Sequence, residues 1–142
     1  MKEQHFKNHM RMVPGFHGFS SMAILALLVG SIINLCNSAR ENLYSASLIC
    51  LVAVILVFLF WYTRSFALRV QDRAIRAEEN FRHYILTGKT LPAELRLSQI
   101  IALRFAPDEE FVELVKKALS EKMTSKEIKM AIQKWKADYH RA

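Results

Sequence analysis

The stretch Tyr44-Ser-Ala-Ser-Leu-Ile-Cys-Leu-Val-Ala-Val-Ile-Leu-Val-Phe-Leu-Phe-Trp61 decides the fold, because it contains no charged residue. At the helical rise of ~1.5 Å per residue it spans about 27 Å, close to the hydrocarbon core of a bilayer. It continues without Gly or Pro into Tyr62-Thr-Arg-Ser-Phe-Ala-Leu-Arg-Val-Gln-Asp-Arg73, which is rich in charge. We therefore expect one helix that leaves a membrane and continues into water.

A second apolar stretch precedes this one, from about Phe16 or Phe19 to Leu35. The connection at residues 37–43 is polar and too short for a domain, so the two spans are expected to form an antiparallel hairpin. Lys and Arg flank the hairpin at its two open ends, whereas the connection holds only Arg40. The positive-inside rule then places both termini in the cytoplasm.

The formal net charge of +7 also points to a membrane surface. A basic excess next to a span favours contact with anionic lipid head groups over nucleic acid. The residues expected to make this contact follow the second span and are Arg64, Arg69, Arg73 and Arg76. The two cysteines, Cys36 and Cys50, lie at different depths and are expected to be free thiols.

The first span carries small and polar residues along one face. Ala26, Gly30 and Asn34 recur at every fourth position, which places them on the same side of a helix. Small residues allow close helix approach in lipid, and an Asn there requires a hydrogen-bonding partner. Three alternatives are open: packing against the second span, contact between chains, and a polar pore lining.

The helix after the second span carries a seam with heptad spacing. Its members are separated alternately by three and four residues and are Ala67, Val70, Ala74, Ala77, Phe81 and Tyr84. This spacing is typical of a coiled-coil face. The seam is expected either to dock on the chain's own small domain or to mediate self-association. Asp72 with Arg76 and Glu78 with Arg82 are acid-before-base pairs that favour a solvated opposite face.

The remaining residues, 88–142, predict a small bundle of three short helices. Gly88 and Leu91-Pro92 end the long helix, and Ser98 is the candidate cap of the next one. Pro107 followed by three acidic residues predicts a second helix start. Thr124-Ser-Lys-Glu127 is a capping box for the third helix, whose inward positions are Ile128, Ala131, Ile132 and Trp135.

No catalytic, cofactor or metal motif stands in the sequence. The acidic group Asp108, Glu109, Glu110 and Glu113 is explained by the first turn of a helix, and His5 and His9 are too few for a metal site. Lysines on the last helix suggest nucleic-acid binding as an alternative, but base-reading residue types are nearly absent there. We therefore expect no cofactor, no metal and no enzymatic activity.

The order of these features resembles a family of small bacterial two-span membrane proteins of unknown function. The resemblance rests on Arg69-Val-Gln-Asp-Arg73, Ile75-Arg-Ala-Glu-Glu79, Leu86-Thr-Gly-Lys89, Gln99 to Ala106, Asp108-Glu-Glu-Phe111 and the ending Ile128-Lys-Met-Ala-Ile-Gln-Lys-Trp135. It covers roughly residues 15–142 and differs at Met130, where the family pattern has a basic residue. It implies a bacterial inner-membrane location and brings no activity.

The sequence thus predicts an all-α protein with four parts. They are a basic interfacial segment (1–15), a transmembrane hairpin (16–62), a cytoplasmic stalk helix continuing the second span (63–87) and a small cytoplasmic helical domain (88–142). The expected function is a non-enzymatic scaffold or accessory subunit that assembles through helix–helix contacts, as a homo-oligomer or within a membrane complex. The alternatives are an oligomeric channel or small transporter and a membrane-tethered nucleic-acid-binding protein.

Overall fold

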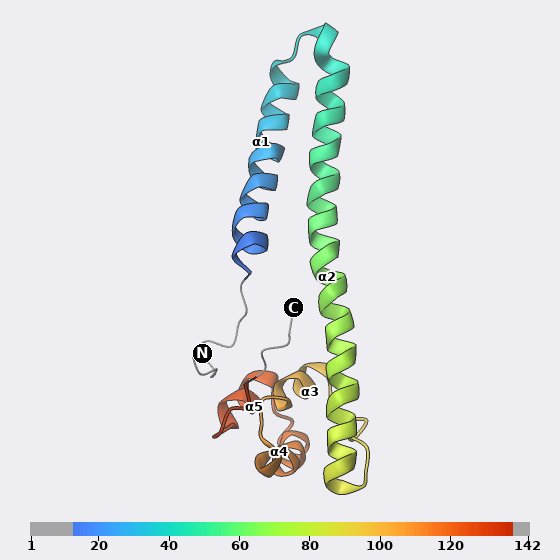
Figure 1. The fold of residues 1–142 in the computed structure, drawn as a ribbon, viewed down its shortest axis with the longest axis vertical. Coiled ribbons are helices and arrows are strands. Elements are labelled where there is room, and N and C mark those ends of the chain that lie inside the picture. Colours follow the sequence, from blue (N-terminus) through green and yellow to red (C-terminus); the bar gives the residue numbers. More distant parts are fainter. Residues whose placement is uncertain (1–12, 138–142) are drawn as a thin grey trace. The chain divides into compact units, whose positions relative to one another are not determined.

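The computed structural model describes residues 13–137, which fall into two compact units, residues 13–67 and residues 68–137. Within these residues the chain forms helices, turns and loops but no strand, which confirms the predicted all-α class. The described part contains five α-helices, labelled α1 to α5 in Figure 1. Two helical segments, Pro14–Asn37 and Arg40–Thr87, are long and apolar enough to cross a membrane.

The first unit begins with a π-helical segment, η1 (Pro14–Ser20), which continues into α1 (Ser21–Asn37). Proline is tolerated at the first helical turn because its missing N–H has no intrahelical partner there. The helical segment therefore begins at Pro14, before either predicted start, Phe16 or Phe19. Cys36 and Cys50 are free thiols, as expected.

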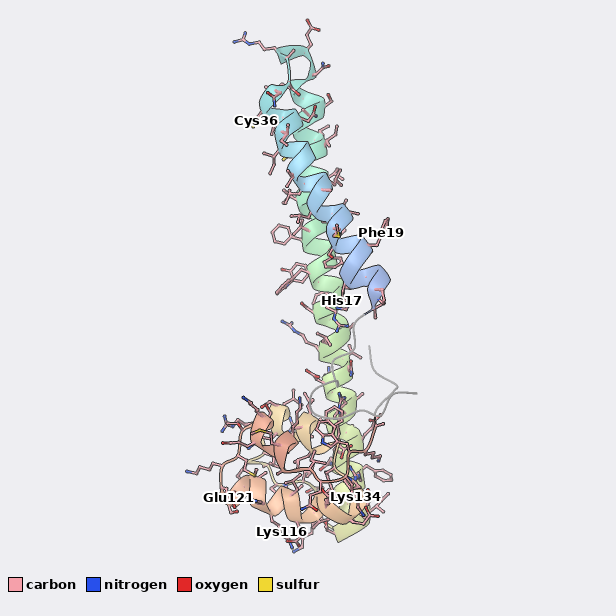
Figure 2. The ribbon with its side chains drawn as sticks, turned by 90° about the vertical axis from the view of Figure 1, so that its left-hand side faces the viewer. His17, Phe19, Cys36, Lys116, Glu121 and Lys134 are labelled. Carbon is pink, nitrogen blue, oxygen red and sulfur yellow. The ribbon has the colours of Figure 1, made fainter. Side chains whose placement is uncertain are left out.

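Small side chains are the buried ones in this unit. Ser31, Ala46 and Ala53 are buried, and the ring of Phe16 stacks on that of Phe60 with 4.2 Å between centroids. The large apolar side chains lie outside: Phe19, labelled in Figure 2, is 79% exposed. Small buried residues let helices approach closely, while the large side chains cover the outer surface of the unit.

A short 3-10 turn, η2 (Arg40–Asn42), leads into α2 (Leu43–Thr87), an uninterrupted helix of 45 residues. Gly88 ends it in a left-handed conformation with φ of 72°, and its N–H donates to the carbonyl of Tyr84 at 2.8 Å. Glycine adopts this conformation without the steric cost that a Cβ would bring. The predicted end of the long helix at Gly88 is therefore confirmed.

The second unit contains residues 68–87 of α2 and three short helices: α3 (Leu97–Leu103), α4 (Asp108–Ser120) and α5 (Ser125–Ala131). The three short helices contact one another around one apolar core (Figure 1). The largest fully buried side chains are Phe105, Phe111, Leu103, Ile128 and Val115. Lys116, Glu121 and Lys134, labelled in Figure 2, are exposed on this unit.

The start of α3 differs from the prediction. Arg96, not Ser98, is the N-cap, and its N–H donates to the side-chain oxygen of Gln99 at 2.8 Å. The side-chain nitrogen of Gln99 donates to the carbonyl of Met123 at 2.7 Å. The cap is at Arg96 because the side-chain amide of Gln99 hydrogen-bonds to two backbone groups, the N–H of Arg96 and the carbonyl of Met123. Ser98 is exposed.

The turn between α4 and α5 holds a non-glycine residue in the left-handed region. Lys122 has φ of 50°, the N–H of Met123 donates to Ala118, and that of Lys122 donates to Leu119. These two hydrogen bonds form a Schellman motif, in which the residue after the cap is usually glycine. Lys122 therefore carries the backbone cost that a glycine at this position would avoid.

The predicted capping box of α5 is confirmed. The N–H of Thr124 donates to the carboxylate of Glu127 at 2.6 Å, and the N–H of Glu127 donates to the Thr124 hydroxyl at 3.3 Å. These hydrogen bonds to Thr124 hold the pKa of Glu127 below its ordinary value. Ile128 and Ile132 are buried as predicted. Trp135 also packs inward, against Phe105, although it lies beyond the end of α5.

Candidate functional site

The part of α2 within the second unit presents two different faces. One face is buried against the helical domain through Ile75, Glu79 and His83. These residues follow helical spacing on a side that does not include the predicted seam. The helical domain therefore packs on a stripe of α2 that contains both polar and apolar side chains. The seam lies on a different side of the helix.

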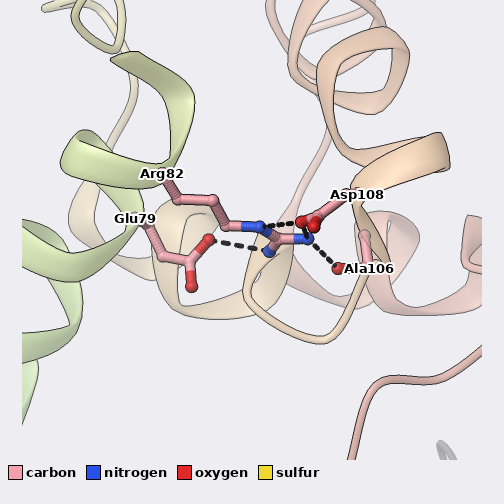
Figure 3. A network of polar contacts seen from close by, with 4 residues as sticks. All are labelled: Glu79, Arg82, Ala106 and Asp108. Carbon is pink, nitrogen blue, oxygen red and sulfur yellow. Dashed lines mark hydrogen bonds and ion pairs between the residues drawn. The ribbon is translucent and has the colours of Figure 1, made fainter. Parts of the chain in front are cut away.

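Arg82 is the central residue of the attachment, shown in Figure 3. Its Nε donates to a carboxylate oxygen of Asp108 at 2.6 Å, one Nη donates to the carbonyl of Ala106 at 2.7 Å, and the other donates to Glu79 at 3.0 Å. The guanidinium also lies 4.3 Å from the ring centroid of Phe111. One side chain thus joins α2 to the loop before α4, to the start of α4 and to the apolar core.

Neither of the two acid–base pairs predicted on the surface of α2 forms in the described part of the chain. Arg82 pairs with Glu79 and Asp108 rather than with Glu78, and within residues 13–137 no ion pair joins Asp72 and Arg76. The guanidinium turns toward the domain because it reaches Asp108 and the Ala106 carbonyl there while it still binds the buried carboxylate of Glu79 on α2. An exposed pair on a helix contributes only a few tenths of a kcal/mol, typically ~0.3 to 0.5.

Glu79 is a buried carboxyl, and burial raises its pKa above the ordinary value of 4.5. The positive charge of Arg82 and its hydrogen bond oppose this increase. The net direction is upward because removal of the carboxylate from water is the largest effect. Sequence reasoning missed Glu79 because its neighbour Glu78 fits an exposed helix equally well, and only the fold distinguishes the two.

Two further side chains of α2 hold the loop that follows it. The ring nitrogen Nδ1 of His83 donates to the carbonyl of Lys89 at 2.7 Å, and the side-chain oxygen of Asn80 accepts from the N–H of Leu91 at 2.8 Å. The loop carbonyl and amide are thereby satisfied without regular secondary structure. These contacts fix the path of the chain between α2 and α3.

The predicted seam is exposed along its whole length. Val70, Phe81 and Tyr84 are 68%, 65% and 54% exposed, and Ala67, Ala74 and Ala77 are exposed as well. The seam therefore does not dock on the chain's own domain, which was one of the two alternatives. An apolar stripe of this length on a folded surface is typical of an interaction face.

The small-residue face of α1 is exposed in the same way. Ala26, Gly30 and Asn34 are exposed, and the space beside Gly30 is open. The buried residue of α1 is Ser31, whose hydroxyl donates to the carbonyl of Leu28 at 2.8 Å. Packing against the second span therefore involves a different face of α1.

The arginines predicted to contact lipid are accessible. Arg69, Arg73 and Arg76 are exposed and Arg64 is partly buried. Arg73 and Arg76 line a groove of about 450 Å³ in the second unit, beside Asn80, Leu91 and Pro92. Within residues 13–137 neither of these two guanidinium groups has an ion-pair partner, so both can bind a group supplied from outside.

The acidic residues of α4 take separate partners. Asp108 binds Arg82, and the carboxylate of Glu110 accepts from the backbone N–H groups of Gln133 and Lys134, both at 3.0 Å. Glu113 pairs with Lys116 at 2.9 Å. In the described part of the chain no three His, Cys, Asp or Glu residues gather as a metal site, and His5 and His9 lie outside it.

These features define an all-α protein with two helices long and apolar enough to cross a membrane, the second of which continues into a polar helical unit. Over residues 1–142 the chain matches the model of a family described as a family of unknown function, DUF6526, and it belongs to that family. Neither a curated protein nor a solved structure matches the chain significantly.

Proposed function

We propose that this protein is a two-span membrane protein of the bacterial inner membrane with both termini in the cytoplasm. Its two spans form a hairpin, and α2 continues as a stalk that carries the helical domain. It acts as a non-enzymatic scaffold or accessory subunit that assembles through helix–helix contacts. Arg64, Arg69, Arg73 and Arg76 bind anionic groups near the inner leaflet.

The exposure of the apolar segments supports the membrane location. Only 6% and 11% of the most apolar windows of the two long helical segments are buried within the chain. A core helix of a soluble protein is mostly buried, because exposed apolar surface costs about 25 cal/mol per Å² in water. A bilayer removes this cost. The Phe16–Phe60 stack and the burial of Ala46 and Ala53 support the hairpin.

The observation that carries the assembly role is the exposed seam on α2. The chain's own helical domain occupies the stripe of Ile75, Glu79 and His83, and the seam side chains within residues 68–137 stay exposed. Val70, Phe81 and Tyr84 would remain in water in an isolated chain, which is unfavourable. A partner helix would cover them.

The mass of the complex in mild detergent tests this proposal. We expect wild-type protein to elute at a mass above that of one chain, and the double variant Ala74→Glu, Ala77→Glu to lose the partner. The control is Leu86→Glu with Ser98→Glu, which adds the same charge at exposed positions off the seam. An assembly whose mass is the same in both double variants would contradict the proposal.

A further inference from the structure

We propose that the partner on the seam is a second copy of this chain, and that the two α2 helices pair as a short parallel coiled coil. This inference rests on the proposed function, because it requires both copies to be inserted in one bilayer in the same orientation. It adds the identity of the partner, the direction of the helices and the charged residues that fix their register.

The heptad positions separate the two faces of α2. Ala67, Ala74 and Phe81 occupy position a, and Val70, Ala77 and Tyr84 occupy position d. Most residues that bind the chain's own domain lie at positions b, c and f, which point away from the a and d seam; they are Ile75, Glu79, Arg82 and His83. Asn80, at position g beside the seam, binds the Leu91 N–H of the following loop. The a and d side chains stay exposed next to this loop, which leaves them accessible to a second helix.

Charge complementarity selects a second copy. In a parallel pair, a residue at position g lies beside the residue at position e of the partner, five positions further along. Arg73 is at position g and Glu78 is at position e, so each copy places Arg73 beside Glu78 of the other. In the dimer the anionic group bound by Arg73 is this carboxylate, and Arg64, Arg69 and Arg76 are the arginines that contact lipid. Two such pairs form by symmetry. Both side chains are exposed, and within residues 13–137 neither is engaged in an ion pair.

An antiparallel pair loses this match, because g then faces g and e faces e, so Arg73 no longer lies beside Glu78. The bilayer also excludes it, since both copies insert with the same topology. The alanines at a and d allow close approach near the membrane, and Phe81 and Tyr84 can stack on their own copies farther out. Three heptads are short for a coiled coil in water, but confinement to a bilayer raises the effective concentration.

A charge swap tests the register in the full-length protein. Arg73→Glu or Glu78→Arg alone places like charges together twice, and we expect the dimer dissociation constant to rise about tenfold. The combined variant Arg73→Glu, Glu78→Arg restores the pairs and should return the constant to near the wild-type value. Fluorescence energy transfer between labelled copies diluted in liposomes measures it. Lys126→Glu, exposed on α5 and off the seam, is the matched control and should leave it unchanged.

Disulfide cross-linking tests whether the two α2 helices are parallel, without a charge change on the seam. In a Cys36→Ser, Cys50→Ala background, Ala74→Cys should form an intermolecular disulfide in native membranes after mild oxidation. Arg76→Cys, exposed at position c, should not. Far-ultraviolet circular dichroism and thermal unfolding of every variant establish that the helices are intact.

Each negative result of these experiments leads to a different conclusion. A single chain bound to a stoichiometric second protein would overturn self-pairing and leave the assembly role standing. A dimer that Ala74→Glu with Ala77→Glu dissociates, but that the combined charge swap does not rescue, would overturn the parallel register. A dimer that the double glutamate variant leaves intact would overturn both this inference and the proposed function.

Discussion

At the scale of single residues, Arg82 has the largest expected effect on stability. Its removal leaves the buried Glu79 without its cation and the Ala106 carbonyl without its donor. Loss of one partner of a buried charged network costs about 2 to 4 kcal/mol. We therefore expect Arg82→Ala to lower the free energy of unfolding by this amount in urea titrations of the detergent-solubilised protein. Arg76→Ala, whose side chain is exposed, should change it by less than ~0.5 kcal/mol.

Glu79 should make stability depend on pH. Its pKa is raised in the folded chain, so the folded state binds the proton more tightly than the unfolded state does. The resulting stabilisation is complete below the ordinary pKa of 4.5 and is lost as the pH rises through the raised folded pKa. We expect Glu79→Gln to remove this decline when urea midpoints are measured across that range. Glu121→Gln, at an exposed position, should follow the wild-type profile.

Lys122 offers a stabilising substitution. Because it sits at φ of 50° in a Schellman motif, Lys122→Gly should relieve backbone strain and raise the free energy of unfolding by about 0.5 to 1 kcal/mol. Lys117→Gly, inside α4, should instead lower it by about 1 kcal/mol, since glycine is a poor helix former. A Lys122→Gly variant less stable than wild type would show that the Lys122 side chain makes a compensating contribution.

At the scale of elements, α2 is a helix whose two faces have different tasks. Phe111→Ala, in the core against which α2 docks, should destabilise the fold by about 3 to 5 kcal/mol. Phe81→Ala removes a ring of the same size from the exposed seam, so the unfolding free energy of the single chain should change by less than ~0.5 kcal/mol. Urea titration at a detergent dilution that keeps the protein monomeric compares the two. Equal losses would mean that the seam belongs to the folded core.

The sequence predicted where the helices begin and end better than it predicted which of their faces are buried. The end of α2 at Gly88 and the start of α5 at Thr124 followed from local chemistry, because glycine and a capping box act within one turn. The seam also followed from spacing alone. The docked stripe did not, since Ile75, Glu79 and His83 form no apolar pattern, and the choice between Glu78 and Glu79 depends on residues near Asp108.

At the scale of the whole molecule, the proposed topology can be measured directly. In a Cys36→Ser, Cys50→Ala background, Asn42→Cys lies in the connection between the spans. It should react with a membrane-impermeant maleimide in spheroplasts, whose inner membrane is intact. Lys116→Cys, exposed on α4, should react only after the inner membrane is opened. Labelling of both positions in spheroplasts with an intact inner membrane would contradict a hairpin with cytoplasmic termini.

The sequence by itself determined that the chain is helical, that two segments are apolar enough to cross a membrane, and where the long helix ends. These properties depend on composition and on interactions within a few residues. The tertiary structure alone decided that the seam of Ala74, Ala77 and Phe81 stays exposed and that Arg82 fastens the helical domain to α2. Which face of a helix is covered depends on residues distant in the chain, and their positions are fixed only when the core around Phe105 and Phe111 has packed.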